Sequence, residues 1–281
     1  MKIKINSDST CDLPKELLEK YDITLFPLTV IKNGENFQDN VTITPADIFA
    51  HVAAGGDLCS TTAGNVGEYA DLFTKYAADY DAVVHINLGS GFSSSYQNAT
   101  LAAMDFDNVI TIDSQNLSTG QGHIVLKAVE LSRSCTDLQE LKAQIEAYVP
   151  RVEASFVLDQ LKYMVKGGRC SSAAALGANL LNLKPCIEVK DGKMSVVKKY
   201  RGSYSKCLVN YVKDRLSGRE DIEDDLIFIT NTPVSDDELT AVQNAVSEYG
   251  SFFKTVVHSE AGCTVSCHCG PGTLGVLFIR K

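Results

Sequence analysis

The chain has 281 residues, of which 44% are hydrophobic and 22% charged, and its formal net charge at pH 7 is −9. This length and composition predict a globular protein that is long enough for two domains of ordinary size. The net negative charge, with Lys and Arg scattered along the chain, argues against a nucleic-acid-binding surface, because phosphate binding needs a concentrated basic face.

The compartment is predicted from what the chain lacks. No apolar run approaches the ~20 residues of a membrane span, and the chain opens with an alternating strand instead of a signal peptide. We therefore expect a cytoplasmic protein without stable membrane insertion. Nine cysteines are dispersed along the chain, and this distribution predicts reduced thiols rather than structural disulfides.

The first half of the chain predicts strands that alternate with helices. Alternating or β-branched runs predict the strands, and helical periodicity with capping residues predicts the helices. The expected strands lie at residues 2–6, 23–31, 82–88 and 109–112, and Asn33-Gly34 is a strong hairpin signal. The expected helices cover residues 14–20, 45–54 and 119–132, and three more end at about residues 79, 104 and 148. Asp12 is a possible cap of the first helix and Thr44 of the second, and Thr136 with Gln139 predicts a capping box for the helix that ends at about 148.

The second half also predicts both kinds of element, but with antiparallel pairs. Asp191-Gly192 joins two alternating strands as a hairpin. The expected strands lie at residues 154–157, 186–190, 194–200, 226–231, 252–257 and 274–279, and the expected helices at 159–166, 171–181, 203–216 and 236–249.

These elements predict an α/β protein of two α/β domains. The N-terminal domain, residues 1–155, is expected to contain a mostly parallel sheet with helices. The C-terminal domain, residues 156–281, is expected to contain a mixed sheet with helices. We expect the ligand to lie between the two domains.

The stretch AVVHINLGSGFSSSYQNA at residues 82–99 is a candidate binding site. It predicts a buried parallel strand, a Gly/Ser loop at its carboxyl end and the start of a helix. Gly89 and Gly91 allow a close approach of the backbone, and the serines that follow supply hydroxyl donors. Such a strand–loop–helix junction can bind a carboxylate or a phosphate. An ordinary capped turn is the alternative interpretation.

Residues 89–94 also leave a second function open. The loop follows a strand and opens a helix, as a dinucleotide-binding fingerprint does, although its third position is serine instead of glycine. A dinucleotide-binding oxidoreductase is therefore the alternative function. The GxGxxG pattern at residues 270–275 is no candidate, because too few residues follow it for the rest of such a fold.

Two other chemistries are disfavoured by spacing. Ser93 and His268 could suggest a hydrolase, but the loop lacks the GxSxG elbow that exposes a nucleophile. A zinc site could be suggested by the metal-binding side chains that lie close together at Cys263, Cys267, His268 and Cys269, but their spacing fits no common zinc site. We expect neither a metal nor a catalytic serine.

Cations lie beside turns in the second half, at Lys166-Gly-Gly168-Arg169 and at Lys199-Tyr200-Arg201. If the two halves face each other, these cations and the hydroxyl-rich strand ends of the first half would form a cleft for one anionic head group. The apolar run AAALGANLLNL at residues 173–183 predicts a buried helix whose small side chains leave room for an acyl chain.

Five ordered motifs resemble those of the DegV proteins, the fatty-acid-binding subunits of bacterial fatty acid kinase, over essentially the whole chain. They are SDSTCDLP at 7–14, LGSGFSSSYQNA at 88–99, IDSQNLSTGQG at 112–122, LKYMVKGGRCSSAAALGANLLNLKP at 161–185 and HCGPGTLGVLF at 268–278. The resemblance implies a protein that is not itself an enzyme. It would enclose a long-chain fatty acid, need no cofactor, and present the carboxylate to a separate ATP-dependent kinase that forms the acyl phosphate.

The resemblance also implies the residues of the site. Thr61 and Ser93 correspond to the threonine and the serine that hold the carboxylate in the family, and His268 corresponds to the histidine before G-P-G. Arg169 corresponds to the K-G-G-R arginine. We expect Arg169, His268 and Arg201 to face the kinase during phosphate transfer.

Two segments depart from the usual pattern of the family. Thr62-Ala63-Gly64-Asn65 stands where a proline and a serine are usual, and Ser94-Ser95 stands where Gly-Thr is frequent. The second departure leaves the backbone N–H of Ser94 available to an anion, so Ser94 is included among the expected carboxylate-binding residues.

Overall fold

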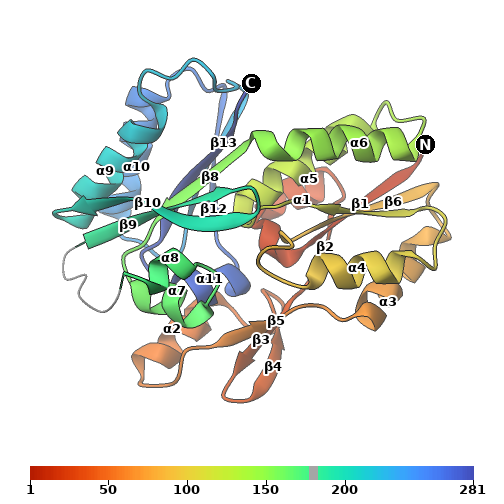
Figure 1. Cartoon of the computed structure of the whole chain (residues 1–281), viewed down its shortest axis with the longest axis horizontal. Coiled ribbons are helices and arrows are strands. Elements are labelled where there is room, and N and C mark those ends of the chain that lie inside the picture. The colour runs from red at the N-terminus through yellow and green to blue at the C-terminus, as the bar shows by residue number, and fades with distance from the viewer. Residues whose placement is uncertain (177–182) are drawn as a thin grey trace.

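The structure is a computed structural model, which describes residues 1–176 and 183–281. The described residues form a parallel sheet, a larger mixed sheet and a small third sheet. Figure 1 shows the parallel sheet with its helices on one side of the molecule and the mixed sheet on the other, with the small sheet below them in this view. The predicted α/β class is confirmed.

The first sheet is parallel, with the strand order β2-β1-β6-β7. All residues of β6 are buried, as expected for a central strand that is covered on both faces. The strands are β1 (Ile3–Asp8), β2 (Thr24–Phe26), β6 (Ala82–Asn87) and β7 (Val109–Asp113). The accompanying helices are α1 (Lys15–Lys20), α3 (Val66–Ala77), α4 (Ser95–Ala103), α5 (Ser118–Ser132) and α6 (Leu138–Tyr148), with a short 3-10 turn η1 (Ser9–Cys11) after β1.

The second sheet is mixed, with the strand order β10-β9-β8-β13-β11-β12. Its strands are β8 (Val152–Val157), β9 (Leu183–Lys190), β10 (Lys193–Arg201), β11 (Leu226–Asn231), β12 (Thr255–Glu260) and β13 (Leu274–Ile279). β11 and β12 pair in parallel, whereas the other neighbours pair antiparallel. Helices α9 (Tyr204–Leu216) and α10 (Asp236–Tyr249) share a buried core with this sheet, which includes Tyr211 and Ile229.

The third sheet comes from the first quarter of the chain and packs against a helix near the C-terminus. Its strand order is β4-β3-β5, from β3 (Thr29–Lys32), β4 (Glu35–Gln38) and β5 (Ser60–Thr62). Helix α11 (Cys263–Cys269) packs against β5, α2 (Pro45–Ala53) and α7 (Leu161–Gly167), and Figure 1 shows this group together with α8 (Ser171–Ala174). Sequence analysis did not predict α11, because its short run of cysteine, threonine and serine has no amphipathic period.

The strand expected at residues 23–31 is wrong. The segment forms two strands, β2 and β3, which belong to different sheets. Pro27 lies between them. Because proline has no backbone N–H to donate to a ladder, it breaks a continuous strand at this point. The hairpin expected at Asn33-Gly34 is confirmed by the pairing of β3 with β4.

Two expected helix caps are also wrong. Helix α1 follows Pro14 and has no side-chain cap, and Asp12 instead adopts a φ of 48° and turns its carboxylate towards α11. Helix α6 is capped by Asp137, which accepts hydrogen bonds from the backbone N–H groups of Gln139 and Glu140 at 2.8 and 2.9 Å. The carboxylate of Asp137 lies one residue closer to the helix than the hydroxyl that we expected.

The helix expected at residues 171–181 is only partly described. Helix α8 ends at Ala174, and residues 177–182 lie outside the described part of the chain, as does most of the apolar run at 173–183. The strand expected at residues 252–257 is wrong in position, since β12 covers Thr255–Glu260. Across the described ranges, no helix is both long enough and apolar enough to cross a membrane.

The division into domains at residue 155 stays a prediction. Strand β8 runs through that position, and α5 packs against both β6 and β13. The largest hydrophobic core also draws residues from both halves, for example Ile86 and Ile187.

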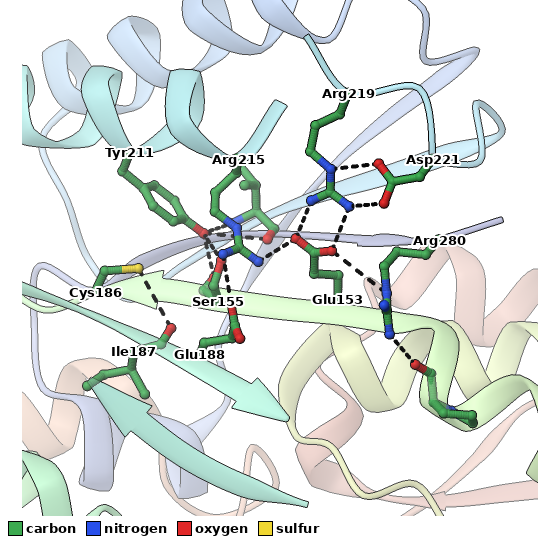
Figure 2. Close-up of polar contacts among 12 residues, drawn as sticks. Glu153, Ser155, Cys186, Ile187, Glu188, Tyr211, Arg215, Arg219, Asp221 and Arg280 are labelled. Atoms are coloured by element: carbon green, nitrogen blue, oxygen red, sulfur yellow. Dashed lines mark hydrogen bonds and ion pairs between the residues drawn. The ribbon is translucent and has the colours of Figure 1, made fainter. Parts of the chain in front are cut away.

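A charged cluster fixes the end of α9 on the mixed sheet (Figure 2). Glu153 of β8 accepts hydrogen bonds from Arg215 and from both terminal nitrogens of Arg219, and Nε of Arg280 lies 3.9 Å from its carboxylate. The Glu153 side chain is only 13% exposed. Because a largely desolvated carboxylate needs several donors, the hydrogen bonds from the arginines stabilise Glu153, and Glu153 in turn holds the arginines in place.

Candidate functional site

The candidate site is a cavity where the carboxyl ends of β1 and β6 meet the small sheet, α7 and α11. Its empty space, including the part open to solvent, is about 560 Å³. Its walls come from both halves of the chain and are Thr10, Leu28, Thr61, Thr62, Ala63, Leu88, Phe92, Ser93, Leu117, Met164, Arg169, Met194, Thr264, Val265, His268 and Cys269.

A second cavity, whose empty space including the part open to solvent is about 400 Å³, adjoins the first. Leu117, Val265 and Cys269 line both cavities, so the two share a wall. The second cavity lies against the mixed sheet and is bounded by apolar side chains such as Phe156 and Leu277. The first cavity carries polar groups such as Thr61 and Ser93, and the second presents mainly apolar surface.

The loop after β6 places Ser93 at the polar end. Leu88, at the end of the strand, donates its N–H to the buried carboxylate of Asp8 at 2.8 Å. Gly91 allows the loop to touch the hairpin between β9 and β10, since a Cβ there would lie 2.0 Å from the carbonyl oxygen of Gly192. Ser93 accepts a hydrogen bond from the backbone N–H of Ser95 at 3.1 Å.

The same loop is poorly suited to a dinucleotide phosphate. Its Ser90 donates both the backbone N–H and the hydroxyl to the carboxylate of Asp113, at 3.0 and 2.5 Å. This carboxylate occupies a donor that a phosphate would need, and it would repel a second anion.

Thr61 and His268 meet across the two halves of the chain. Thr61 Oγ1, on β5, lies 2.8 Å from His268 Nε2, on α11. Burial, together with the positive charge of Arg169, lowers the pKa of His268 to about 4. The ring is therefore neutral at pH 7.

The tautomer of His268 follows from its surroundings. Nδ1 is buried and has no hydrogen-bond partner among the described residues, and Gly167 packs so closely that a Cβ there would lie 2.4 Å from Nδ1. We assign the proton to Nε2, because a buried N–H without an acceptor is rarer than an unpaired lone pair. His268 then donates to Thr61, and the hydroxyl hydrogen of Thr61 is free to point into the cavity.

Of the three other predicted site residues, only Arg169 lines the cavity. Arg169 lines it, is exposed, and donates to the carbonyl oxygens of Gly167 and Phe92 at 2.6 and 3.3 Å. Ser94 is the exposed N-cap residue of α4, and Arg201 ends β10 opposite Leu183. Neither Ser94 nor Arg201 is among the described residues that line the cavity.

Helix α11 is held in place by two buried carboxylates that sequence analysis missed as site residues. Asp39 accepts hydrogen bonds from the backbone N–H groups of Cys263 and Thr264 at 2.7 and 3.2 Å. Asp12 accepts one from the N–H of Gly262 at 2.8 Å, and burial raises the pKa of Asp12 to about 8. These two carboxyl groups accept hydrogen bonds from the first N–H groups of the helix that carries His268, and the raised pKa keeps Asp12 mainly protonated at pH 7.

The cysteines of α11 pack and hydrogen bond within the protein. Cys263 donates its thiol to the carbonyl oxygen of Ile43 at 3.2 Å, and Cys269 lines the cavity. Burial raises the pKa of Cys263 and Cys269 to about 12, so both are neutral thiols. Over residues 1–176 and 183–281, no group of three His, Cys, Asp or Glu side chains could hold a metal ion.

The chain has an α/β fold in which a cavity with polar groups lies beside a second, mainly apolar cavity. The chain belongs to the DegV family, since the family described as "Uncharacterised protein, DegV family" matches residues 2–281. A DegV domain-containing protein of Clostridium acetobutylicum is 32% identical to it, over 100% of this chain and 99% of that protein. A DegV domain-containing protein of Caldanaerobacter subterraneus is 30% identical, over 100% of this chain and 99% of that protein.

Solved structures share the whole fold. A DegV family protein from Thermus thermophilus, described by its fatty acid binding, has a TM-score of 0.89 with 27% identity and covers 100% of both chains. DegV from Bacillus subtilis, described as a fatty acid binding protein, has a TM-score of 0.82 with 25% identity and the same coverage. A stearic acid-binding protein from Eubacterium ventriosum has a TM-score of 0.84 with 25% identity, over 99% of this chain and 98% of that one.

The buried neutral histidine predicts a pH effect on stability. As the pH falls from about 6.5 towards 4, unfolded His268 takes up a proton that the folded protein excludes, so the free energy of unfolding decreases in this window. We expect His268→Gln to lose less stability than the wild type between these pH values, measured by urea unfolding. Asp12 has the opposite pH dependence, because its folded-state pKa is raised, but it is present in both proteins. Equal pH slopes would contradict a buried neutral His268.

Proposed function

We propose that this protein binds one long-chain fatty acid in the two adjoining cavities, with the carboxylate at the Thr61–Ser93 end, and presents it to a partner ATP-dependent kinase. One observation carries the proposal: the hydroxyls of Thr61 and Ser93 line one cavity together with His268 of the second half, and a mainly apolar cavity adjoins it. The descriptions of the similar Thermus, Bacillus and Eubacterium proteins support the ligand class. Because ATP is the phosphate donor of the proposed kinase, we propose that the protein acts in the cytoplasm.

The chemistry of the cavity suits such a ligand. Burial of each CH₂ is worth ~0.8 kcal/mol, so a sixteen-carbon chain supplies roughly 12 kcal/mol before the costs of ordering. The carboxylate must exchange water for protein donors. We assign these donors to the hydroxyls of Thr61 and Ser93, with His268 behind Thr61 and the backbone N–H of Ser94 as a further donor.

We assign the exposed cations to the kinase step. Arg169 stands at the mouth of the cavity, where a cation can offset the charge that builds up when phosphate approaches a carboxylate. Arg201 is exposed at the end of β10, and we propose it as a contact of the kinase. The protein itself needs no cofactor for this role.

Extraction of the bound ligand tests the ligand class. Protein purified from a bacterial host is denatured, extracted with organic solvent and analysed by mass spectrometry. We expect about one fatty acid per chain. Recovery of NAD or FAD without lipid would favour the dinucleotide-binding oxidoreductase instead.

Removal of single hydroxyls tests the carboxylate contacts. We expect Thr61→Ala and Ser93→Ala each to weaken palmitate binding by about 1.5–3 kcal/mol in titration calorimetry, because each leaves a dehydrated carboxylate with one donor fewer. Binding of the matching fatty alcohol should change less. Ser94→Ala is the matched control, since it keeps the backbone N–H and should bind as the wild type does. Unchanged affinity in both Thr61 and Ser93 variants would refute the assignment of the head group.

Phosphate transfer tests the role of Arg169 and His268. With ATP, Mg²⁺, labelled fatty acid and a DegV-associated kinase, we expect Arg169→Ala and His268→Ala to reduce acyl phosphate about ten-fold or more while lipid stays bound. Arg133→Ala is the control, because Arg133 is an exposed arginine at the end of α5, outside the residues that line the cavity. Full product from both site variants would show that neither side chain serves the transfer.

A further inference from the structure

Thr264 lines the cavity and carries a buried hydroxyl that no hydrogen bond within the described residues uses. The residue lines the cavity and is only 4% exposed. Its Oγ1 is buried and has no hydrogen-bond partner among the described residues. The other threonines of the cavity differ: Thr10 donates to Gln121 Oε1 at 2.8 Å, Thr61 bonds His268 at 2.8 Å, and Thr62 is exposed.

The position of Thr264 in its helix explains why the hydroxyl is unpaired. A threonine inside a helix usually turns its hydroxyl back to a carbonyl three or four residues earlier. Helix α11 begins at Cys263, so the residues three and four before Thr264 precede the helix. The carbonyl oxygen of one of them, Ala261, instead accepts a hydrogen bond from Ser266 Oγ at 3.3 Å.

The backbone of Thr264 is fixed, and the side chain shares a helix face with His268. The N–H of Thr264 donates to the buried carboxylate of Asp39 at 3.2 Å. Residues four apart lie on the same face of a helix, one turn from each other, and Thr264 and His268 both line the cavity. Thr264 is therefore held beside the polar end of the site, one helical turn from His268.

We propose that Thr264 is a ligand-contacting residue, whose hydroxyl donates a hydrogen bond to an oxygen of the bound fatty acid's head group. An unpaired buried hydroxyl destabilises a protein, whereas the same hydroxyl paired with a carboxylate stabilises the complex. The hydroxyl can therefore donate to the ligand without breaking a hydrogen bond within the protein. This proposal rests on the function proposed above and adds a donor from the second half of the chain.

The test replaces the hydroxyl with a methyl group of nearly the same size. We expect delipidated Thr264→Val to be at least as stable as the wild type in thermal unfolding, because an unpaired polar group is removed. We expect it to bind palmitate about ten-fold more weakly in titration calorimetry. Thr264→Ser keeps the hydroxyl and should bind within about two-fold of the wild type.

Thr111→Val is the matched control outside the two cavities. It removes a buried hydroxyl that is paired with Thr100 Oγ1 at 2.9 Å, so it should lower the melting temperature with little change in palmitate affinity. If Thr264→Val binds palmitate as the wild type does, the Thr264 contact is refuted while the fatty-acid function stands. If Thr264→Val melts well below the wild type without lipid, the hydroxyl has an internal partner, which also overturns the proposal. If the wild type binds no fatty acid, the proposed function fails first, and this inference fails with it.

Discussion

The pairing of two buried carboxyl groups with the start of helix α11 is the interaction on which the site depends. Asp12 and Asp39 belong to the first half of the chain, and they accept hydrogen bonds from the N–H groups of residues 262–264 near its end. A buried carboxyl group without donors is costly, and the first N–H groups of a helix are unpaired without acceptors. Each partner thus satisfies the other. The helix is held against β5, where His268 reaches Thr61.

The polar end of the cavity is built mostly from neutral groups. Burial and Arg169 keep His268 neutral, and hydroxyls supply the donors. The cation closest to these groups, Arg169, is exposed at the mouth. A carboxylate can be held this way without the desolvation of a fully buried ion pair. In the function proposed above, such a site would hold the ligand mainly by its apolar chain and leave the head group near the exposed Arg169.

Local chemistry predicted much of the fold. The hairpins at Asn33-Gly34 and Asp191-Gly192, and the cap of α2 by Thr44, lie where their residues predicted them. Where predictions failed, a neighbour in the chain or in space decided the outcome. Pro27 split one expected strand into two sheets. Asp12 left its own helix uncapped, because the N–H of Gly262 competes for the same carboxylate.

The sequence by itself determined the α/β class, most element positions, the Gly/Ser loop after β6 and, through the ordered motifs, the family. Its residue types and turn signals act over a few neighbours, so they can be recognised without coordinates. Only the tertiary structure decided that α11 exists as a helix and that it faces β5. It also decided which hydroxyls are paired, since Thr10 and Thr264 look alike in the sequence, yet only Thr10 has a partner within the described residues. These features depend on contacts between residues more than 100 positions apart, whose geometry no local pattern encodes.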